Sequence, residues 1–157
     1  MIALRNVRPD DCATICSHRR RMFAEDGVDA ATLDALAEPF AAWLQERLDD
    51  GRYFGFVAED DGVIVAGIGL IVLDWPPHFL HPRSAERGYI LNVFVEPEYR
   101  GRGLAAELMG RSEEEFRHRG IVYEVLHASK KGRPVYEKLG WTASAEMSKR
   151  LVSKRLG

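Results

Sequence analysis

A glycine-rich turn between an apolar run and an amphipathic segment constrains the fold more than any other feature of the sequence. The run YILNVFVEP, residues 89–97, is apolar on both faces and predicts a central strand. It leads through RGRG, residues 100–103, into a helix predicted over residues 102–119. A plain turn needs one glycine at most, so two glycines and two arginines indicate that an anionic ligand approaches this backbone closely.

Hydrophobic periodicity predicts a mixed α/β fold for the rest of the chain. We expect helices at 10–25, 30–49, 102–119 and 133–139. We expect strands at 2–7, 53–60, 63–74, 89–97, 121–129 and 141–152. The resulting order is β-α-α-β-β-β-α-β-α-β, one mixed central sheet flanked by helices, with a right-handed crossover from 89 to 129. A chain of 157 residues suits a single domain, residues 1–157, around one core.

Composition disfavours several classes of partner and compartment. The formal net charge is −2, whereas nucleic-acid and membrane surfaces usually require a basic balance, so we expect neither partner. No apolar run reaches the roughly 18 residues that span a bilayer. The first residues, MIALRNVRPDD, lack the apolar region of a signal peptide, so we expect a cytoplasmic protein. The sequence leaves a homodimer open.

The glycine-rich turn is suited to a diphosphate. A helix N-terminus has free N–H groups and a partial positive charge, and glycines remove the side chains that would block a ligand. The alternative is a tight strand-to-helix turn with solvated arginines. The G-x-x-x-x-G-K-[ST] phosphate loop is absent, and Ala106 stands where a dinucleotide-binding G-x-G-x-x-G would have its last glycine.

Two segments resemble motifs of the GCN5-related N-acetyltransferase (GNAT) superfamily. The acetyl-CoA motif of that superfamily, [Q/R]-x-x-G-x-[G/A], is similar to the stretch from Arg100 to Ala105. The stretch LHASKKGRPVYEKLGW, residues 126–141, resembles a later motif that contains a tyrosine and ends in a glycine–aromatic pair. The element order expected above is also the order of that superfamily, so the resemblance covers nearly the whole chain.

This resemblance implies a GNAT-like fold and an acetyl-CoA-dependent transfer to a primary amine of a small molecule or peptide by direct attack. It assigns acetyl-CoA binding to Val93, Phe94, Val95, Arg100, Gly101, Arg102, Gly103, Leu104, Ala105, Ala106 and Ser129. Ser129 replaces the asparagine that the superfamily usually has at the end of that strand. A non-catalytic acyl-CoA-binding sensor or regulatory module is the alternative, and a dinucleotide-binding protein is a third, less favoured one.

The catalytic residues expected from the resemblance are Tyr136 and Glu124. Tyr136 matches the usual general acid, which protonates the leaving thiolate; a packed core tyrosine is the alternative. Glu124 lies within an apolar strand, where a carboxylate is costly unless it is partnered or functional, and is the expected base. A strand-edge glutamate in water is the alternative. Asn92, His127 or a chain of water molecules also remain open as the base.

The loop at residues 75–88 is expected to bind the acceptor. It is rich in proline, aromatic residues and histidine, and irregular loops often determine specificity. The expected acceptor-binding residues are Trp75, His78, Phe79, His81 and Asn92. The two histidines form an H-x-x-H pattern without an evident third ligand, so we expect no metal.

Overall fold

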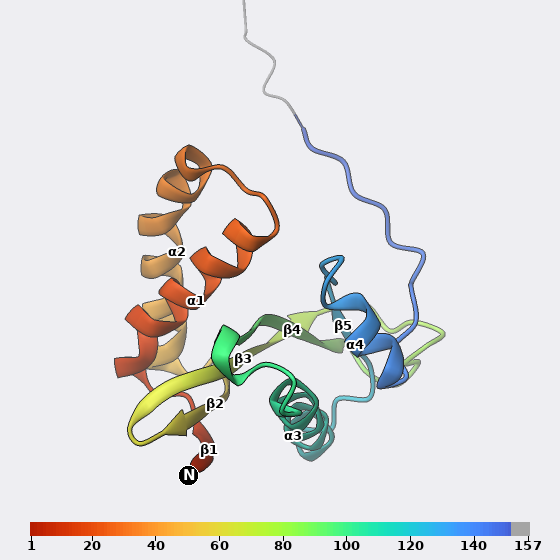
Figure 1. Ribbon diagram of the computed structural model, residues 1–157. Coiled ribbons are helices and arrows are strands. Elements are labelled where there is room, and N and C mark those ends of the chain that lie inside the picture. Colours follow the sequence, from red (N-terminus) through yellow and green to blue (C-terminus); the bar gives the residue numbers. More distant parts are fainter. Residues whose placement is uncertain (152–157) are drawn as a thin grey trace, which may run out of the picture.

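The computed structural model describes residues 1–151 as a five-stranded mixed sheet with helices on both faces (Figure 1). The strands are β1 (Ile2–Asn6), β2 (Phe54–Asp60), β3 (Val63–Asp74), β4 (Glu86–Val95) and β5 (Glu124–Leu126). They lie in the order β1-β2-β3-β4-β5, and only the β4–β5 pair is parallel. The predicted mixed α/β architecture is therefore confirmed.

The predicted helices are present with small shifts at their ends. They are α1 (Cys12–Glu25), α2 (Ala30–Asp50), α3 (Leu104–His118) and α4 (Arg133–Lys138), and two short 3-10 turns are η1 (Pro9–Asp11) and η2 (Pro97–Tyr99). Asp29 caps α2 by accepting a hydrogen bond from the amide of Thr32. No helix in residues 1–151 combines the length and apolar character needed to cross a bilayer.

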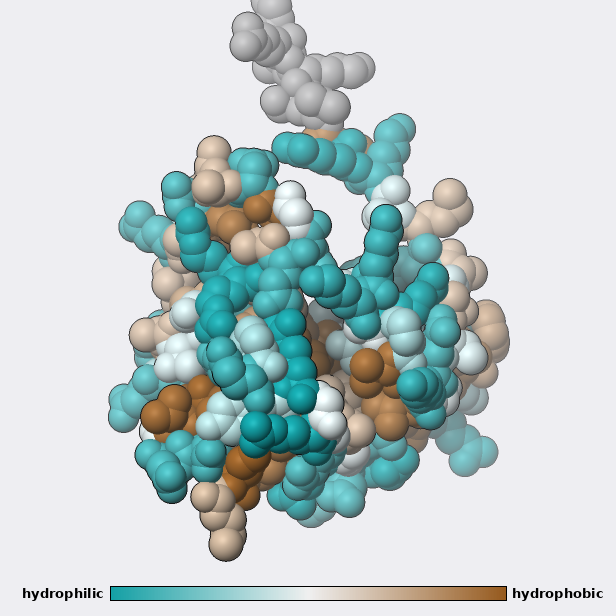
Figure 2. All heavy atoms as spheres, in the orientation of Figure 1, coloured by the Kyte–Doolittle hydropathy of each residue, from teal (hydrophilic) through white to brown (hydrophobic). Residues whose placement is uncertain are grey.

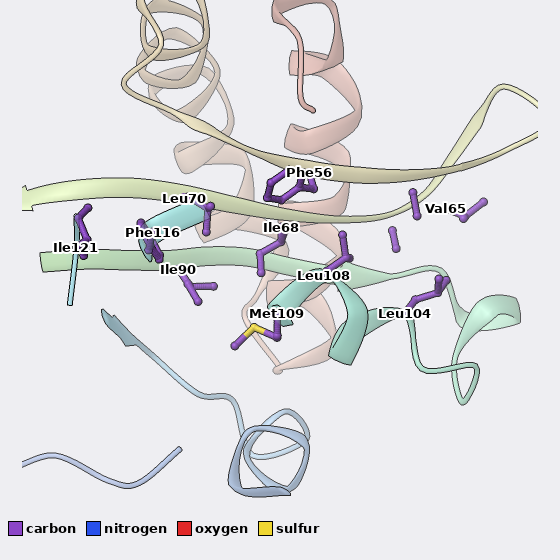
Figure 3. Packing of buried hydrophobic residues seen from close by; sticks show 12 residues of the cluster. Phe56, Val65, Ile68, Leu70, Ile90, Leu104, Leu108, Met109, Phe116 and Ile121 are labelled. Atoms are coloured by element: carbon purple, nitrogen blue, oxygen red, sulfur yellow. The ribbon is translucent and has the colours of Figure 1, made fainter. Parts of the chain in front are cut away.

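Each face of the sheet has its own hydrophobic cluster. On one face, apolar residues of β2, β3 and β4 pack against α3, as the stick view in Figure 3 shows for Ile68, Ile90 and Leu108. On the other face, Ile15 of α1 and Leu44 of α2 pack with Tyr53, which precedes β2. The sheet therefore separates α1 and α2 from α3. A site at the edge of the sheet, near the ends of these helices, can take residues from both layers.

The parallel pairing of β4 with β5 is short. Only Gly88, Tyr89 and Ile90 pair with Glu124–Leu126. Two residues further along β4, Asn92 has a positive φ of 57°, and the β3–β4 register shifts between Gly67 and Gly69. The resulting bulge bends β4, and β4 and β5 no longer pair beyond this point.

Several strand predictions were wrong. The strand predicted at 89–97 ends at Val95, because Pro97 begins η2. The strand predicted at 121–129 is only β5, because its pairing with β4 is confined to Gly88–Ile90. The 75–88 loop ends at residue 85, because Glu86–Gly88 extend the hairpin by pairing with Val72–Asp74. No strand forms over 141–151, a mostly polar, exposed segment next to a three-residue β5; Val152 lies outside the described residues.

Candidate functional site

One large cavity, about 810 Å³ in volume, opens where α1, the second half of β4, the start of α3, the end of β5 and α4 approach one another. Figure 2 shows a hollow between the side formed by α1 and α2 and the side formed by α4, with hydrophobic residues in its depth. The volume suits a ligand of cofactor size. The separation of β4 from β5 makes this space, because two strands that stayed hydrogen-bonded to each other would leave no gap between them.

The turn before α3 presents consecutive free amides to the cavity. Gly101 and Gly103 have φ values of 76° and 82°, which glycine adopts without strain, and both line the cavity. No residue in the described part of the chain accepts a hydrogen bond from the amides of residues 101–106. Such amides at a helix N-terminus bind phosphate oxygens. Leu104, Ala105 and Ala106 complete this end of the cavity lining.

The two arginines of the turn have protein partners instead of facing the cavity freely. Arg100 donates from Nε to the carbonyl of Val95 at 2.9 Å and pairs through Nη2 with Glu25 at 2.7 Å. Arg102 donates to the carbonyl of Glu98 at 3.0 Å and is not part of the cavity lining. The turn therefore offers free backbone amides to the cavity, whereas its arginine side chains have partners elsewhere in the chain, and Arg100 ties β4 to the end of α1.

The end of β4 offers an unpaired strand edge. Val93, Phe94 and Val95 all line the cavity, and on one side β4 pairs with β3 through Phe94 and Val95. On the other side the pairing with β5 stops at Ile90. An extended ligand with amide groups can pair with such an edge. The carbonyl of Val95 already accepts one hydrogen bond, from Arg100, and has one lone pair left.

Tyr136 brings a phenol to the opposite wall. It lies on α4, lines the cavity and packs against the α3-side cluster. Burial raises its pKa above the ordinary value, so it stays protonated at neutral pH. No residue among 1–151 forms a hydrogen bond with its hydroxyl group. Ser129 also lines the cavity, and its oxygen accepts the amide of Gly132, which leaves its O–H as a donor.

Glu124 does not reach the cavity. It is absent from the cavity lining, and the charged groups that act on it are Glu113 and Arg117 of α3. Burial, with a smaller contribution from Glu113, raises its pKa to about 7, and Oε2 is buried without a hydrogen-bond partner in the described chain. The pKa of Glu124 is raised as the sequence suggested, but its side chain lies near α3 and not at the cavity.

A tyrosine–histidine pair lies where Glu124 was expected. The hydroxyl group of Tyr89 on β4 is hydrogen-bonded to Nδ1 of His127, which follows β5, and both line the cavity. The other ring nitrogen, Nε2, lies 3.7 Å from a carboxylate oxygen of Glu146 and is close to solvent, because 70% of the His127 side chain is exposed. Burial is the main cause that raises the pKa of Tyr89. The pair links the cavity to the surface.

Arg19 was missed by the sequence analysis. It lines the cavity from α1 and donates from Nη1 to Oδ1 of Asn92 at 2.6 Å. Asn92 donates from Nδ2 to the hydroxyl group of Tyr53 at 3.0 Å, so its amide is engaged at both ends and can act as no base. The sequence signal was the spacing of Arg19, which lies with Cys12, Cys16 and Phe23 on one partly buried face of α1.

The four predicted residues of the β3–β4 loop do not line the cavity. His81 is only 1% exposed; its Nε2 accepts from Nε of Arg87, and Nδ1 bonds the carbonyl of Ser84. Trp75 lies under the guanidinium of Arg87 at 4.2 Å. The loop is held together by these contacts, and His78 and Phe79 stack on each other at 4.0 Å.

Neither loop histidine belongs to a metal centre in the described chain. Over residues 1–151, no group of three or more His, Cys, Asp or Glu side chains is arranged to hold a metal ion.

Of the predicted site residues, the structure brings together the α3 turn, the β4 edge, Asn92, Ser129 and Tyr136. It leaves out Glu124, Arg102 and the loop.

Two solved structures are similar to this chain over almost its whole length. A GCN5-related N-acetyltransferase from Ralstonia eutropha is 49% identical, covering 96% of this chain and 99% of that chain, with a TM-score of 0.94. A predicted acetyltransferase from Clostridium acetobutylicum, solved with acetyl-CoA, is 28% identical, covers 96% of each chain and has a TM-score of 0.88.

A curated relative and a family model point the same way. The glucosamine 6-phosphate N-acetyltransferase of Trypanosoma brucei brucei is 36% identical over 88 residues, which are 56% of this chain and 57% of that protein. The match thus spans little more than half the length of that relative. The model described as the acetyltransferase (GNAT) family matches residues 16–141. The cavity, the free amides before α3 and the separation of β4 from β5 agree with this match. The match identifies the chain as a member of the GNAT family of acetyltransferases.

Proposed function

We propose that the protein transfers the acetyl group of acetyl-CoA to a primary amine on a small molecule or peptide. The observation that carries this proposal is the meeting, in one cavity, of the free amides of residues 101–106 with the unbonded hydroxyl group of Tyr136. The relative solved with acetyl-CoA supports the donor, and the glucosamine 6-phosphate N-acetyltransferase supports an amine acceptor.

In this proposal, three parts of the chain hold the donor. The amides of residues 101–106 bind the diphosphate. The free edge of β4 at Val93 pairs with the amides of the pantetheine arm, and the hydroxyl group of Ser129 adds a donor on the facing side. Lys131, which also lines the cavity, supplies a positive charge near the diphosphate. Arg100 and Arg102 are instead bonded to Glu25 and to the carbonyl of Glu98.

Tyr136 acts as the general acid. The amine nitrogen attacks the thioester carbonyl carbon, the C–N bond forms and the C–S bond breaks. Tyr136 gives its phenol proton to the departing sulfur and regains one from solvent. Because burial raises its pKa, the phenol is protonated at the pH of the reaction. The products are an amide and a free thiol, so no oxidant or reductant is needed.

Tyr89 and His127 act as the base. The attacking amine loses a proton to the Tyr89 oxygen as Tyr89 passes its own proton to Nδ1 of His127. His127 then releases a proton from Nε2 to water on the side of Glu146. This relay reaches the surface from the cavity, which Glu124 does not. It therefore replaces Glu124 in the proposed mechanism.

The test is release of free coenzyme A from acetyl-CoA over a panel of amines and peptides. We expect turnover with at least one class of amine, and Tyr136→Phe should lower kcat by about 10²–10⁴-fold while acetyl-CoA affinity stays close to wild type. Tyr123→Phe is the matched control, because it removes a phenol outside the cavity. Binding of acetyl-CoA without turnover of any amine would instead favour an acyl-CoA-binding sensor.

A further inference from the structure

We propose that Arg19 binds an anionic oxygen group, a carboxylate or a phosphate, that the amine acceptor carries besides its amine. This inference rests on the proposed function and narrows its class of acceptor. It starts from the placement of the Arg19 guanidinium at the wall of the cavity, on the α1 side and away from the free amides before α3.

Aromatic rings fix the Arg19 guanidinium and leave only its edge for a ligand. The central carbon lies 4.6 Å from the centre of the Phe23 ring and 4.4 Å from that of Phe40. The bond from Nη1 to Asn92 Oδ1 at 2.6 Å holds one corner. A stacked, oriented guanidinium presents parallel N–H groups, which match the two oxygens of a carboxylate or phosphate.

The positive charge of Arg19 has no counter-ion in the described chain. No carboxylate among residues 1–151 forms an ion pair with it, and its Nε is buried without an acceptor. The neighbours that act on its charge are two phenols and the Cys16 thiol, and burial raises the pKa of that thiol to about 11. Phenols and such a thiol are neutral at pH 7.

Other arginines near the cavity are neutralised, which sets Arg19 apart. Arg21 makes a two-pronged pair with Glu96, and Arg100 pairs with Glu25. A partly buried cation without a counter-ion is costly, and an anionic ligand offsets that cost. Burial is in fact the main cause that lowers the pKa of Arg19, although a guanidinium remains charged.

The position of Arg19 relative to Tyr89 limits how the acceptor is built. Arg19 is bonded to Asn92, three residues beyond Tyr89 on β4, and all three residues line the same cavity. An acceptor whose amine meets Tyr89 and His127 therefore has its anionic group within the same cavity when that group meets Arg19. Amino acids carry such a group next to the amine and phosphorylated amino sugars carry it across the ring, whereas simple alkylamines carry none.

Matched pairs of acceptors test the inference. The probes are phenylalanine with phenylalaninamide, and glucosamine 6-phosphate with glucosamine, each assayed by release of coenzyme A. We expect Arg19→Met to lower kcat/KM for the anionic member of a responding pair by about 10- to 100-fold and to change the neutral member little. Each compound is compared between enzymes, so the different basicities of the amines cancel.

Arg20→Met is the matched control, because Arg20 follows on the same helix but is exposed and paired with Asp34 at 2.7 Å. Asn92→Asp is the second test, for the case that Arg19→Met does not fold. It keeps the guanidinium and its stacking but supplies a carboxylate at the atom that Nη1 already contacts. The selectivity for the anionic member should then fall in the same direction.

Calorimetric binding of the same probes separates the two proposals. If no amine releases coenzyme A, the proposed function fails, and the binding data alone judge Arg19. A response in only the phosphate pair, or only the carboxylate pair, identifies which group Arg19 binds. Equal losses for both members of each pair, losses of the same size in Arg20→Met, or no Arg19-dependent binding of either anionic probe would overturn the inference.

Discussion

At the residue scale, two titratable groups with perturbed environments stand on opposite sides of the sheet. Tyr89 meets His127 at the cavity, and Glu124 meets Glu113 and Arg117 on the side of α3. A perturbed pKa is a frequent sign of a functional group, but structural charge clusters also perturb pKa values. The direction of the side chain distinguishes a functional group from a structural one here: Tyr89 and His127 face the cavity, and Glu124 does not.

Removal of the Tyr89 hydroxyl group tests the proposed relay. Tyr89→Phe keeps the ring on β4 but breaks the hydrogen bond to His127, so we expect kcat to fall by about 10²-fold with acetyl-CoA affinity unchanged. Steady-state kinetics and acetyl-CoA titration measure both quantities. Tyr123→Phe should leave kcat unchanged, and an undiminished kcat in Tyr89→Phe would exclude the relay.

Glu124 should affect stability more than rate. With a folded-state pKa of about 7 against an ordinary 4.5, the folded protein holds a proton that the unfolded chain has lost between these values. Wild-type stability therefore falls as pH rises through this window, and the loss is complete above about pH 7. Glu124→Gln avoids this loss, so we expect it to be more stable than wild type at pH 8 and equal below pH 4.5.

The expected gain at pH 8 is about 1–2 kcal/mol, reduced from the full shift because the carboxyl group is partly exposed to solvent. Urea unfolding at pH 4, 6 and 8 measures it, with Glu114→Gln on the exposed face of α3 as the control. Loss of the acidic limb of the pH–rate profile in Glu124→Gln would return the role of base to Glu124.

At the scale of elements, the contact of α3 with the sheet depends on a missing side chain. Gly88 of β4 lies under the ring of Phe116, and a Cβ there would stand 2.7–2.8 Å from three ring atoms. Phe116 is itself buried, so it has little room to move. A glycine that weakens a strand in isolation thus lets β4 and α3 pack closely.

Two alanine substitutions of opposite sign test this packing. Gly88→Ala forces Phe116 out of place, and we expect a loss of about 1–3 kcal/mol in the free energy of unfolding. Gly110→Ala, in the middle of α3 where a Cβ meets nothing within 4 Å, should instead stabilise by about 0.5–1 kcal/mol. Chemical denaturation measures both, and a stabilised Gly88→Ala would contradict the close packing.

At the scale of the whole molecule, the cavity lies at the edge of the sheet, between the helices of its two faces. Its walls come from α1 on one face of the sheet, from α4 near the other, and from β4, β5 and the α3 turn between them. The Arg100–Glu25 ion pair, 75 positions apart in the chain, joins the α3 turn to α1. A ligand in the cavity therefore contacts elements from both layers, and its binding should stabilise the folded state as a unit.

Ligand-linked stability tests this arrangement. Acetyl-CoA at 100 times its Kd should raise the free energy of unfolding by about 2.7 kcal/mol. Gly103→Val should abolish that increment, because it adds a branched side chain among the free amides that are proposed to bind the diphosphate. Gly51→Val is the matched control: the two glycines have φ values of 82° and 80°, so both variants carry a similar strain of about 1–3 kcal/mol.

Thermal unfolding with and without acetyl-CoA separates strain from binding. The intrinsic Tm should fall by similar amounts in the two variants, whereas the shift caused by acetyl-CoA should survive only in Gly51→Val, whose site lies at the end of α2. An unchanged acetyl-CoA shift in Gly103→Val would mean that the diphosphate binds elsewhere.

The sequence by itself determined the order of the elements from β1 to α4, the hairpin of β2 and β3, and the glycine-rich turn before α3. These features follow from local rules: hydrophobic period, helix caps and the φ values that only glycine adopts freely. The motif also pointed to Tyr136, which lines the cavity, and its role as the acid stays a prediction. The strand lengths were predicted less well, because a strand ends where its neighbour stops pairing, as β5 does after Leu126.

Only the tertiary structure decided which polar side chains face the cavity. Arg19 meets Asn92 from 73 positions away, Arg100 meets Glu25 from 75, and Tyr89 meets His127 from 38. No local pattern encodes such partners, because they depend on how the sheet brings distant elements together. The same packing turned Glu124 toward α3 and buried His81 within its loop. The chemistry of a charged group is set by these neighbours, so its role follows from the fold.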